Sequence, residues 1–310
     1  MASVHDWVRL LRLPNHATAA ADVVAGWLVV AGIRDLEPLP PAVALALTAS
    51  VALYAAGMVL NDVFDVATDR RERPERPLPA GRIAVGTAAL VGHTLLAAGV
   101  ALGVAAALVA GRAATAVVAA LLAGAVWLYD RHAKATSWGP TVMGSCRSLN
   151  WLLGMTVAGG PTAAWQCLIP AGMGLYVGGI TLFARDEAAR SRRATLAAGA
   201  IAIAAGLALV AWQSSLMIAA GQGAPLVAMR PAANWLLVWL TFITLLSSRN
   251  LLAILDPSGP RVRHAVGNCI MAIITVDAIV VMGRCGEAWG IAVLLLLVPF
   301  MIGRSLVAPT

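Results

Sequence analysis

Residues 42–69 read AVALALTASVALYAAGMVLNDVFDVATD. An apolar run passes here directly into a polar segment with three aspartates, and about 20 mainly apolar residues are enough for a helix to cross a bilayer. If the helix continues, the spacing of Asp62, Asp65 and Asp69 places them within roughly 60° of one another around the helix axis. The stretch therefore predicts a membrane-spanning helix whose end carries three carboxylates on one face.

The rest of the chain is equally apolar. Of its 310 residues, 60% are hydrophobic and 12% are charged, whereas a soluble domain is nearer half apolar and a quarter charged. These values exclude a soluble multidomain architecture and predict an all-α, polytopic transmembrane bundle that forms a single domain over residues 1–310. Nine or ten spans are expected, from candidate runs at about 17–33, 42–61, 83–110, 113–129, 140–159, 164–184, 194–219, 231–248, 265–283 and 287–303.

The positive residues are unevenly distributed between the expected loops. Seventeen of the 22 Lys and Arg residues fall on one side when the loops alternate, and the positive-inside rule assigns that side to the cytoplasm. The loops near 62–82, 130–138 and 185–193 are thus predicted to face the cytoplasm, as are both termini if there are ten spans. Segment 4–13 is predicted to be a short interfacial helix. We expect a multi-pass protein of the inner (cytoplasmic) membrane, surrounded by lipid, with no nucleic-acid partner despite a net charge of +7.

The three aspartates point to a divalent cation. Like charges on one helical face repel unless a cation neutralises them, and Mg²⁺ prefers hard oxygen ligands that it shares with water and a substrate phosphate. Asp62 and Asp65 are predicted to hold the metal and Asp69 to assist, while Asn61 orients a ligand or a phosphate oxygen. The alternative is a solvated charge run in which the acids pair with neighbouring arginines.

At this helix end the sequence resembles the first aspartate-rich signature of the UbiA superfamily of intramembrane prenyltransferases, in Asn61-Asp62-x-x-Asp65-x-x-x-Asp69-Arg70 and the following Arg76-Pro77-Leu78-Pro79-x-Gly81. The resemblance implies a helical bundle that binds Mg²⁺ and an isoprenyl diphosphate and transfers the prenyl chain to a lipophilic acceptor. Finer segments resemble the EboC-like branch, which implies that the acceptor can also be small and polar: Leu10-x-Arg12-x-x-Asn15, Tyr129-Asp130 to Lys134, Cys146-Arg147-x-Leu149-Asn150 and Ile180-Thr181-Leu182-x-x-Arg185-x-Glu187.

The second acidic motif of that family departs from its usual pattern here. Asp186 and Glu187 are adjacent, so on a helix they point about 100° apart and do not form an i, i+4 ligand pair. Both remain candidate ligands for a second Mg²⁺, with an ion pair between Asp186 and Arg190 as the alternative for Asp186. Arg185 is expected to donate to diphosphate oxygens in place of a missing cation.

Several polar residues inside or beside apolar runs complete the candidate site. Arg147 interrupts the fifth run with Asn150 on the same face, and a guanidinium at that depth must face a cavity or a carboxylate. We predict that it holds the diphosphate or shapes its pocket, with structural pairing to Asp277 as the alternative. Asp22 and Asp277 also lie inside apolar runs, where a charged side chain is energetically costly. Each is therefore a candidate functional acid or a buried structural acid. The remaining predicted diphosphate-binding residues are Asn15, Arg70, Lys134 and Asn150.

Together these features predict a Mg²⁺-dependent membrane prenyltransferase that moves an isoprenyl chain from a prenyl diphosphate to a lipophilic or small polar acceptor. A terpene cyclase of the same fold, in which the prenyl cation is quenched internally, is the first alternative. A non-catalytic lipid-binding or transport component is the second. Three aligned acids argue against the second, because binding a hydrocarbon chain alone does not require them.

Overall fold

A computed structural model describes residues 3–185, 192–225 and 232–307, and within these ranges the chain forms helices and no strand. The helices are α1 (Val4–Leu11), α2 (His16–Ala31), α3 (Pro41–Glu72), α4 (Val85–Ala110), α5 (Ala113–Leu128), α6 (Gly139–Val157), α7 (Ala164–Phe183), α8 (Arg193–Ala219), α10 (Ala232–Leu255), α11 (Gly259–Cys285), α12 (Glu287–Leu294) and α13 (Leu297–Val307). Short turns of other helical types lie at Leu13–Asn15 (3₁₀) and Tyr129–Ala133 (π). The predicted all-helical bundle is confirmed.

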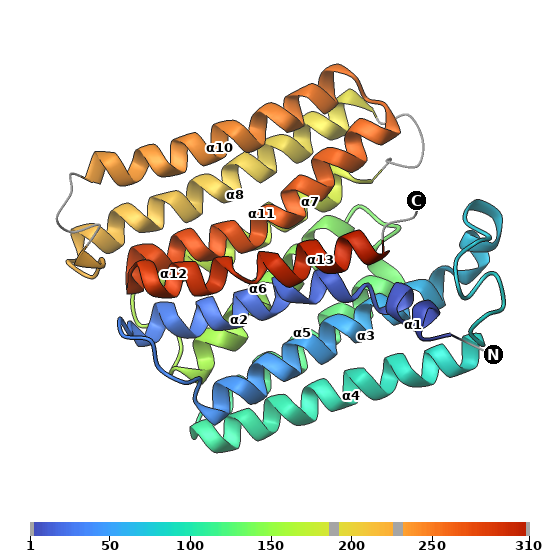
Figure 1. The fold of residues 1–310 in the computed structure, drawn as a ribbon, viewed down its shortest axis with the longest axis horizontal. Coiled ribbons are helices and arrows are strands. Elements are labelled where there is room, and N and C mark those ends of the chain that lie inside the picture. Colours follow the sequence, from blue (N-terminus) through green and yellow to red (C-terminus); the bar gives the residue numbers. More distant parts are fainter. Residues whose placement is uncertain (1–2, 186–191, 226–231, 308–310) are drawn as a thin grey trace.

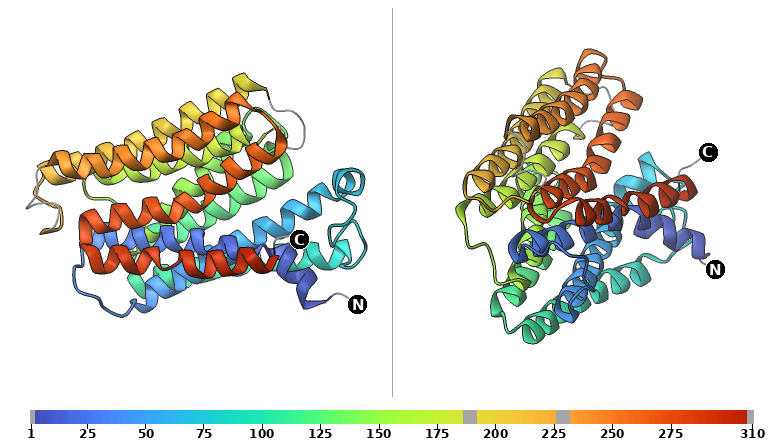
Figure 2. Two further views of the ribbon diagram at one scale, coloured as in Figure 1. Left: turned by 45° about the horizontal axis from the view of Figure 1, so that its top comes forward. Right: turned by 60° about the vertical axis from the view of Figure 1, so that its left-hand side comes forward.

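The long helices lie side by side with their axes roughly aligned (Figures 1 and 2). Helix α2 packs against α3, α6 and α11; α7 packs between α6 and α8; and α4 and α5 cover α3 and α6. Helix α1, the connection from α3 to α4 and the end of α13 gather at one end of the bundle (Figure 1). The end of α3 that carries the aspartates is at this same end.

In the part of the chain that the structure describes, seven helical segments are long and apolar enough to cross a membrane: Pro41–Glu72, Val85–Ala110, Ala113–Ala133, Ala164–Phe183, Arg193–Ala219, Asn234–Leu255 and Gly259–Cys285. Helix α2 has 16 residues, and α6 is made less apolar by Arg147 and Asn150, yet both are enclosed by the others. With these two helices and the α12–α13 segment, the arrangement is compatible with the predicted nine to ten spans.

Three boundaries differ from the expectation. Residues 62–72 of the predicted loop 62–82 are helical, because α3 continues to Glu72. The predicted loop at 130–138 begins as a π-helical turn, in which the amide of Lys134 donates to the carbonyl of Tyr129. The predicted last span, 287–303, is broken between α12 and α13. Pro299 explains the break, because its ring clashes with the carbonyl four residues earlier, that of Leu295.

Small residues allow the central helices to approach closely, as expected for membrane helices rich in Gly and Ala. A Cβ atom placed on Gly154 of α6 would collide with the backbone oxygen of Val23 on α2. One placed on Gly206 of α8 would lie 2.6 Å from the backbone oxygen of Gly172 on α7. These contacts hold α2 against α6 and α7 against α8.

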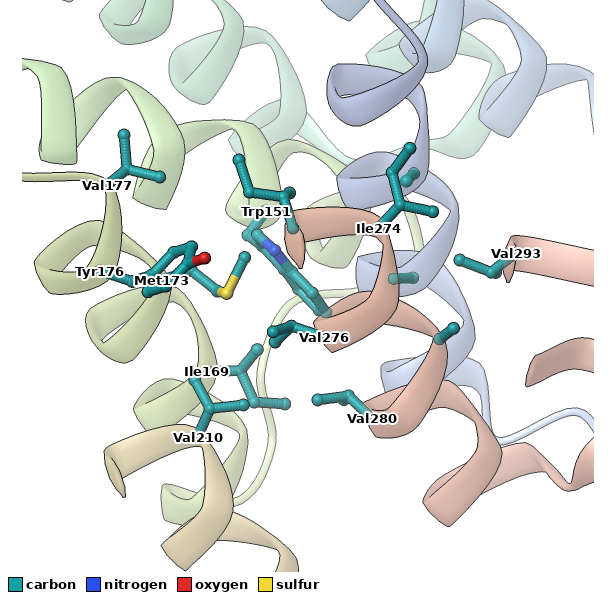
Figure 3. Close-up of a cluster of buried hydrophobic side chains, with 14 of the residues drawn as sticks. Trp151, Ile169, Met173, Tyr176, Val177, Val210, Ile274, Val276, Val280 and Val293 are labelled. Atoms are coloured by element: carbon teal, nitrogen blue, oxygen red, sulfur yellow. The ribbon is translucent and has the colours of Figure 1, made fainter. Parts of the chain in front are cut away.

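Larger side chains fill the space between these helices. Figure 3 shows Trp151 of α6 lying among Met173 and Tyr176 of α7 and Val276 of α11. Trp151 and Tyr176 are fully buried, and the Tyr176 hydroxyl donates to the carbonyl of Cys269 at 2.7 Å. The core therefore fixes α6, α7 and α11 relative to one another, and these helices form walls of the cavity described next.

Candidate functional site

A cavity of about 610 Å³ opens between α2, α3, α5, α6, α7 and α11, a volume within the usual range for small-molecule sites. Its polar lining comprises Arg12, Asn15, Ser50, Tyr54, Asn61, Asp65, Glu72, Arg73, Tyr129, Asp130, Lys134, Cys146, Arg147, Asn150, Thr181 and Arg185. Its apolar lining includes Leu53, Met58, Leu122, Val126, Met143, Val177, Ile180, Val266, Ile270 and Ile273. One space therefore offers both charged groups and hydrocarbon walls.

The end of α3 and the π-helical turn after α5 form one wall. The side-chain amide of Asn61 donates to Asp130 Oδ1 at 3.0 Å, and Asp130 Oδ2 is buried with no hydrogen-bond partner among the described residues. Lys134 Nζ lies 2.5 Å from Asp65 Oδ2 and 3.5 Å from the carbonyl of Asn61. The extra residue that a π turn inserts changes the direction of the following side chains, and here Asp130 and Lys134 both meet α3.

The three aspartates predicted to share one ion are divided in the structure. Asp62 is 5% exposed and lies 2.9 Å from Arg12 and 3.5 Å from Arg76, measured between carboxylate oxygen and guanidinium nitrogen. Asp69 is 4% exposed and lies 2.8 Å from Arg76. Neither lines the cavity, whereas Asp65 does.

The reason for this division is the helical register. Asp62 and Asp69, two turns apart, point within about 20° of each other and both meet Arg76, while Asp65 is rotated by about 60° toward the cavity. Within the described ranges, no group of three or more His, Cys, Asp or Glu side chains is arranged to hold a metal. Asp62 and Asp69 thus pair with arginines while Asp65 faces the cavity, and the binding of one ion by all three aspartates stays a prediction.

Arg12 reaches Asp62 through an unusual backbone turn. Its φ of 49° is in the left-handed region, and among the described residues no other non-glycine residue has a positive φ; such conformations are uncommon and occur at functional sites. Helix α1 is anchored nearby, because Arg82 Nε donates to Asp6 Oδ1 at 2.7 Å. Hydrogen bonds from the side chain and backbone of Ser3, together with Arg82, lower the pKa of Asp6 to about 2.

A second polar group lies deeper along the same cavity. Arg147 Nη1 is 2.5 Å from Asp22 Oδ2 and 3.1 Å from the carbonyl of Thr18. The Asn150 amide donates to the same Asp22 oxygen at 2.7 Å, and the Ser50 hydroxyl donates to Asn150 Oδ1 at 2.6 Å. Arg147 thus meets a carboxylate, as its depth required, but its direct partner is Asp22 and not Asp277.

The other predicted residues divide into three groups. Asn15 and Arg185 line the cavity, as does Lys134. Arg70 is exposed and is not part of the lining, and Arg73 is there instead. Asp186, Glu187 and Arg190 lie outside the described residues, so the second acidic motif and the proposed Asp186–Arg190 pair stay predictions.

The position of Arg70 outside the cavity lining has a reason that is visible in the sequence, and its role in diphosphate binding stays a prediction. Tyr54, Met58, Asn61 and Asp65 follow the 3.6-residue period of one helical face and all line the cavity. Five residues beyond Asp65, Arg70 is rotated about 140° from that face. Sequence reasoning also missed Arg12 as the partner of Asp62 and did not select Asp130, although both lie in the segments quoted above for the EboC-like branch.

The fold and the site together define an intramembrane helical protein whose cavity suits a ligand with a charged head and an apolar body. A comparison with known families agrees with this class: the UbiA prenyltransferase family matches residues 22–268. The chain belongs to that family.

Individual relatives match more locally. The digeranylgeranylglyceryl phosphate synthase of Sulfolobus acidocaldarius is 37% identical over 95 residues, which are 31% of this chain and 33% of that protein. The enzyme of the same name from Methanoculleus marisnigri is 37% identical over 86 residues, 28% of this chain and 29% of that protein. The match thus spans about a third of the length of these curated relatives.

Solved structures resemble the chain over nearly its whole length. A UbiA homologue from Archaeoglobus fulgidus bound to DMAPP and Mg²⁺ has a TM-score of 0.62 at 16% identity, covering 93% of this chain and 99% of that one. The apo structure of a UbiA homologue from Aeropyrum pernix K1 has a TM-score of 0.61 at 19% identity, covering 91% and 98%. At these identities the likeness shows the shared fold.

Proposed function

We propose that this protein is a Mg²⁺-dependent intramembrane prenyltransferase, which transfers an isoprenyl chain from a prenyl diphosphate to a lipophilic or small polar acceptor. The observation that carries the proposal is the continuity of the cavity, in which Asn61, Asp65 and Lys134 lie at one end and hydrocarbon side chains form the walls. Family membership and the synthases among the relatives support the same reaction class. The archaeal homologue bound to DMAPP supports a prenyl diphosphate as donor.

The charged end of the cavity suits a diphosphate. Arg73, Lys134 and Arg185 line it and are the proposed donors to phosphate oxygens. Arg presents a planar fork of N–H groups, whereas Lys is a compact, mobile point charge. When the allylic C–O bond breaks, negative charge develops on the departing diphosphate, and cations already in position stabilise it without reorganisation.

Oxygen donors for Mg²⁺ are present beside these cations. Asn61 and Asp65 line the cavity, and the free Oδ2 of Asp130 is a buried acceptor without a partner in the described structure. These are the hard ligands that Mg²⁺ takes, with phosphate oxygens and water completing its shell. We propose that Asn61, Asp65 and Asp130 hold the ion, which would neutralise diphosphate charge. Asp62 and Asp69 would then act indirectly, by fixing Arg12 and Arg76.

The apolar walls suit the prenyl chain. Leu53, Leu122 and Ile273 extend the cavity away from the charged end, and they exclude water from the reacting carbon. The acceptor oxygen or carbon would form the new bond to that carbon as the C–O bond breaks, and its proton would pass to the released diphosphate. The resemblance to the EboC-like branch remains a prediction and would admit a small polar acceptor.

The test is product analysis of the purified protein in detergent. Prenyl diphosphates of increasing length, with Mg²⁺, are incubated alone and with a panel of lipophilic and polyhydroxylated acceptors, and diphosphate release and products are measured. Acceptor-dependent release with a prenylated product supports the proposal. Release of a hydrocarbon or terpene alcohol without acceptor identifies a cyclase instead, and tight prenyl diphosphate binding without turnover on any acceptor identifies a lipid-binding component.

We further propose that the protein sits in the cytoplasmic membrane with the charged end of the cavity toward the cytoplasm. The positive-inside distribution supports this orientation, because five of the 22 Lys and Arg residues lie between Arg70 and Arg82. A single cysteine placed at exposed Glu75, in a variant lacking the native cysteines, should react with an impermeant reagent only after the membrane is opened. Labelling in intact cells would reverse the assigned orientation.

A further inference from the structure

Two aspartates lie in the interior away from the acidic end of α3. Asp22 of α2 and Asp277 of α11 are each 0% exposed, and their side chains are within hydrogen-bonding reach of each other. The polar group around Asp22 includes Ser50, which is eleven residues before Asn61 on α3 and hence roughly 16 Å deeper along that helix. The pair is therefore distinct from the proposed diphosphate end of the cavity.

The hydrogen bonds of this pair are incomplete. Asp22 Oδ2 accepts from both Arg147 and Asn150. Asp22 Oδ1 and both oxygens of Asp277 are buried. The ring N–H of Trp151 on α6 is within reach of Asp277, whereas no described residue donates a hydrogen bond to Asp22 Oδ1. Two carboxylates that face each other offer only acceptors, so neither can satisfy the other without an added proton.

The charges of the surrounding helices do not balance either. Arg147 of α6 is the cation that contacts the pair, and its guanidinium is already bound to Asp22. Among the described residues, the other ionisable groups that face the network are the phenols Tyr54 of α3 and Tyr176 of α7, and these carry no charge at neutral pH. Two carboxylates and one guanidinium leave one uncompensated negative charge among fully buried groups, which is unfavourable.

We propose that Asp22 and Asp277 share one proton. Asp22 is the carboxylate that pairs with Arg147, and Asp277 is a carboxylic acid that donates to the free Oδ1 of Asp22. One proton both supplies the missing donor and makes the network of Arg147, Asp22 and Asp277 neutral. It is taken up from water when the two acids are buried.

Asp277 acts in this arrangement as a positioning residue. Its proton forms a hydrogen bond to Asp22 Oδ1, while Asp22 Oδ2 accepts hydrogen bonds from Arg147 and Asn150. Arg147 and Asn150 both line the cavity. Because Arg147 is already compensated by Asp22, the deep end of the cavity has no net charge to attract an anion. A neutral hydrogen-bond donor at position 277 should therefore replace the acid, whereas a neutral group at position 22 should not.

The experiment is infrared difference spectroscopy of the purified protein in H₂O and D₂O at pH 9, so that the carboxyl groups nearer the cavity opening are ionised. Asp277→Asn, Asp22→Asn and, as a control, Asp256→Asn are each compared with the unsubstituted protein. Asp256 is exposed and pairs with Arg261 at 2.9 Å. The carbonyl band of a protonated carboxylic acid should be lost in Asp277→Asn. It should be lost in Asp22→Asn as well, because the remaining carboxyl then ionises to balance Arg147. The control should keep the band.

Thermal melting provides the second readout. Asp277→Asn should melt close to the unsubstituted protein, since its amide can donate to Asp22, and Asp22→Asn should melt clearly lower. A band that survives in Asp277→Asn, or a melting temperature lowered as much in Asp277→Asn as in Asp22→Asn, would overturn the shared proton. Failure of Asp277→Asn to fold would overturn it too, because the shared proton requires that a neutral donor of the same shape is tolerated at position 277. None of these readouts depends on enzymatic activity.

Discussion

Asp62 and Asp65 lie three residues apart on α3, but their substitution should affect different properties. Asp62→Asn should lower stability, and Asp65→Asn should lower turnover. In Asp62→Asn the guanidinium groups of Arg12 and Arg76 lose a carboxylate whose side chain is only 7% exposed. A hydrogen bond to a charged group contributes about 1.5–3 kcal/mol. Because the arginine side chains are 36% and 23% exposed, water replaces part of that contribution, and we expect a net loss of about 2–3 kcal/mol. By the size scaling of unfolding entropy for a chain of this length, this lowers Tm by roughly 3–5 °C.

Asp65→Asn should fold normally and lose turnover. The side chains of Asp65 and Lys134 are 30% and 21% exposed, and exposed ion pairs contribute only about 0–1 kcal/mol to stability. The carboxylate lines the cavity, however, and removal of one preorganised electrostatic group from a reaction site typically lowers kcat by about 10²–10³-fold. We therefore expect a loss of at least about 100-fold in kcat/KM with Tm within 2 °C or so of the unsubstituted protein.

The assay combines differential scanning fluorimetry in detergent with diphosphate release at saturating Mg²⁺. Asp256→Asn serves as the matched control, because Asp256 forms an exposed ion pair remote in sequence from the motif, and it should change neither quantity. If Asp65→Asn retained most of its turnover, the assignment of Asp65 to the reaction site would be refuted. If Asp62→Asn left Tm unchanged while abolishing turnover, Asp62 would have to act in the cavity despite its position in the structure.

Three further outcomes are expected. Arg185→Ala should weaken diphosphate binding by about ten- to a hundredfold, because a charged donor to phosphate is lost; unchanged binding in isothermal titration would return Arg185 to an interfacial role. Gly154→Ala should destabilise the protein by about 2–3 kcal/mol, since its Cβ collides with the α2 backbone, whereas Gly124→Ala, where a Cβ meets open space, should stay within about 1 kcal/mol; equal melting temperatures would contradict this close approach. Asp6 should hold α1 in place above about pH 4 and release it as the pH falls through about 2, because its folded pKa is depressed. Trp7 fluorescence should report that release, and in Asp6→Asn the same step should be absent.

Much of the fold could be predicted from the sequence because the signals are local. Twenty-residue apolar runs and alternating positive loops indicate a helical membrane bundle whatever the neighbours of each helix are. The acidic end of α3 was equally visible, because a fixed rotation per residue decides which side chains share a face. The break at Leu295 is less local, because Pro299 favours it but Pro170 lies inside the continuous helix α7.

The partners of the charged residues could not be predicted in this way. Asp62 and Asp65 differ little in local sequence, yet one meets Arg12 from the start of the chain and the other meets Lys134 from the turn after α5. The sequence analysis named Asp277 as the possible partner of Arg147, whereas the packing of α6 on α2 brings Arg147 to Asp22. Tyr54, Met58, Asn61 and Asp65 share one face of α3, but only the packed structure shows that this face lines a cavity.

The sequence by itself determined that this chain is a membrane bundle with an acidic helix end, and only the tertiary structure decided which acid faces the cavity. The physical reason lies in the range of the two kinds of interaction. Transfer into a bilayer depends on each segment's own composition and length, so it is summed along the chain. An ion pair acts over a few ångströms between residues that are 50 or 125 positions apart, such as Arg12 with Asp62 and Asp22 with Arg147, so it exists only after the helices have packed.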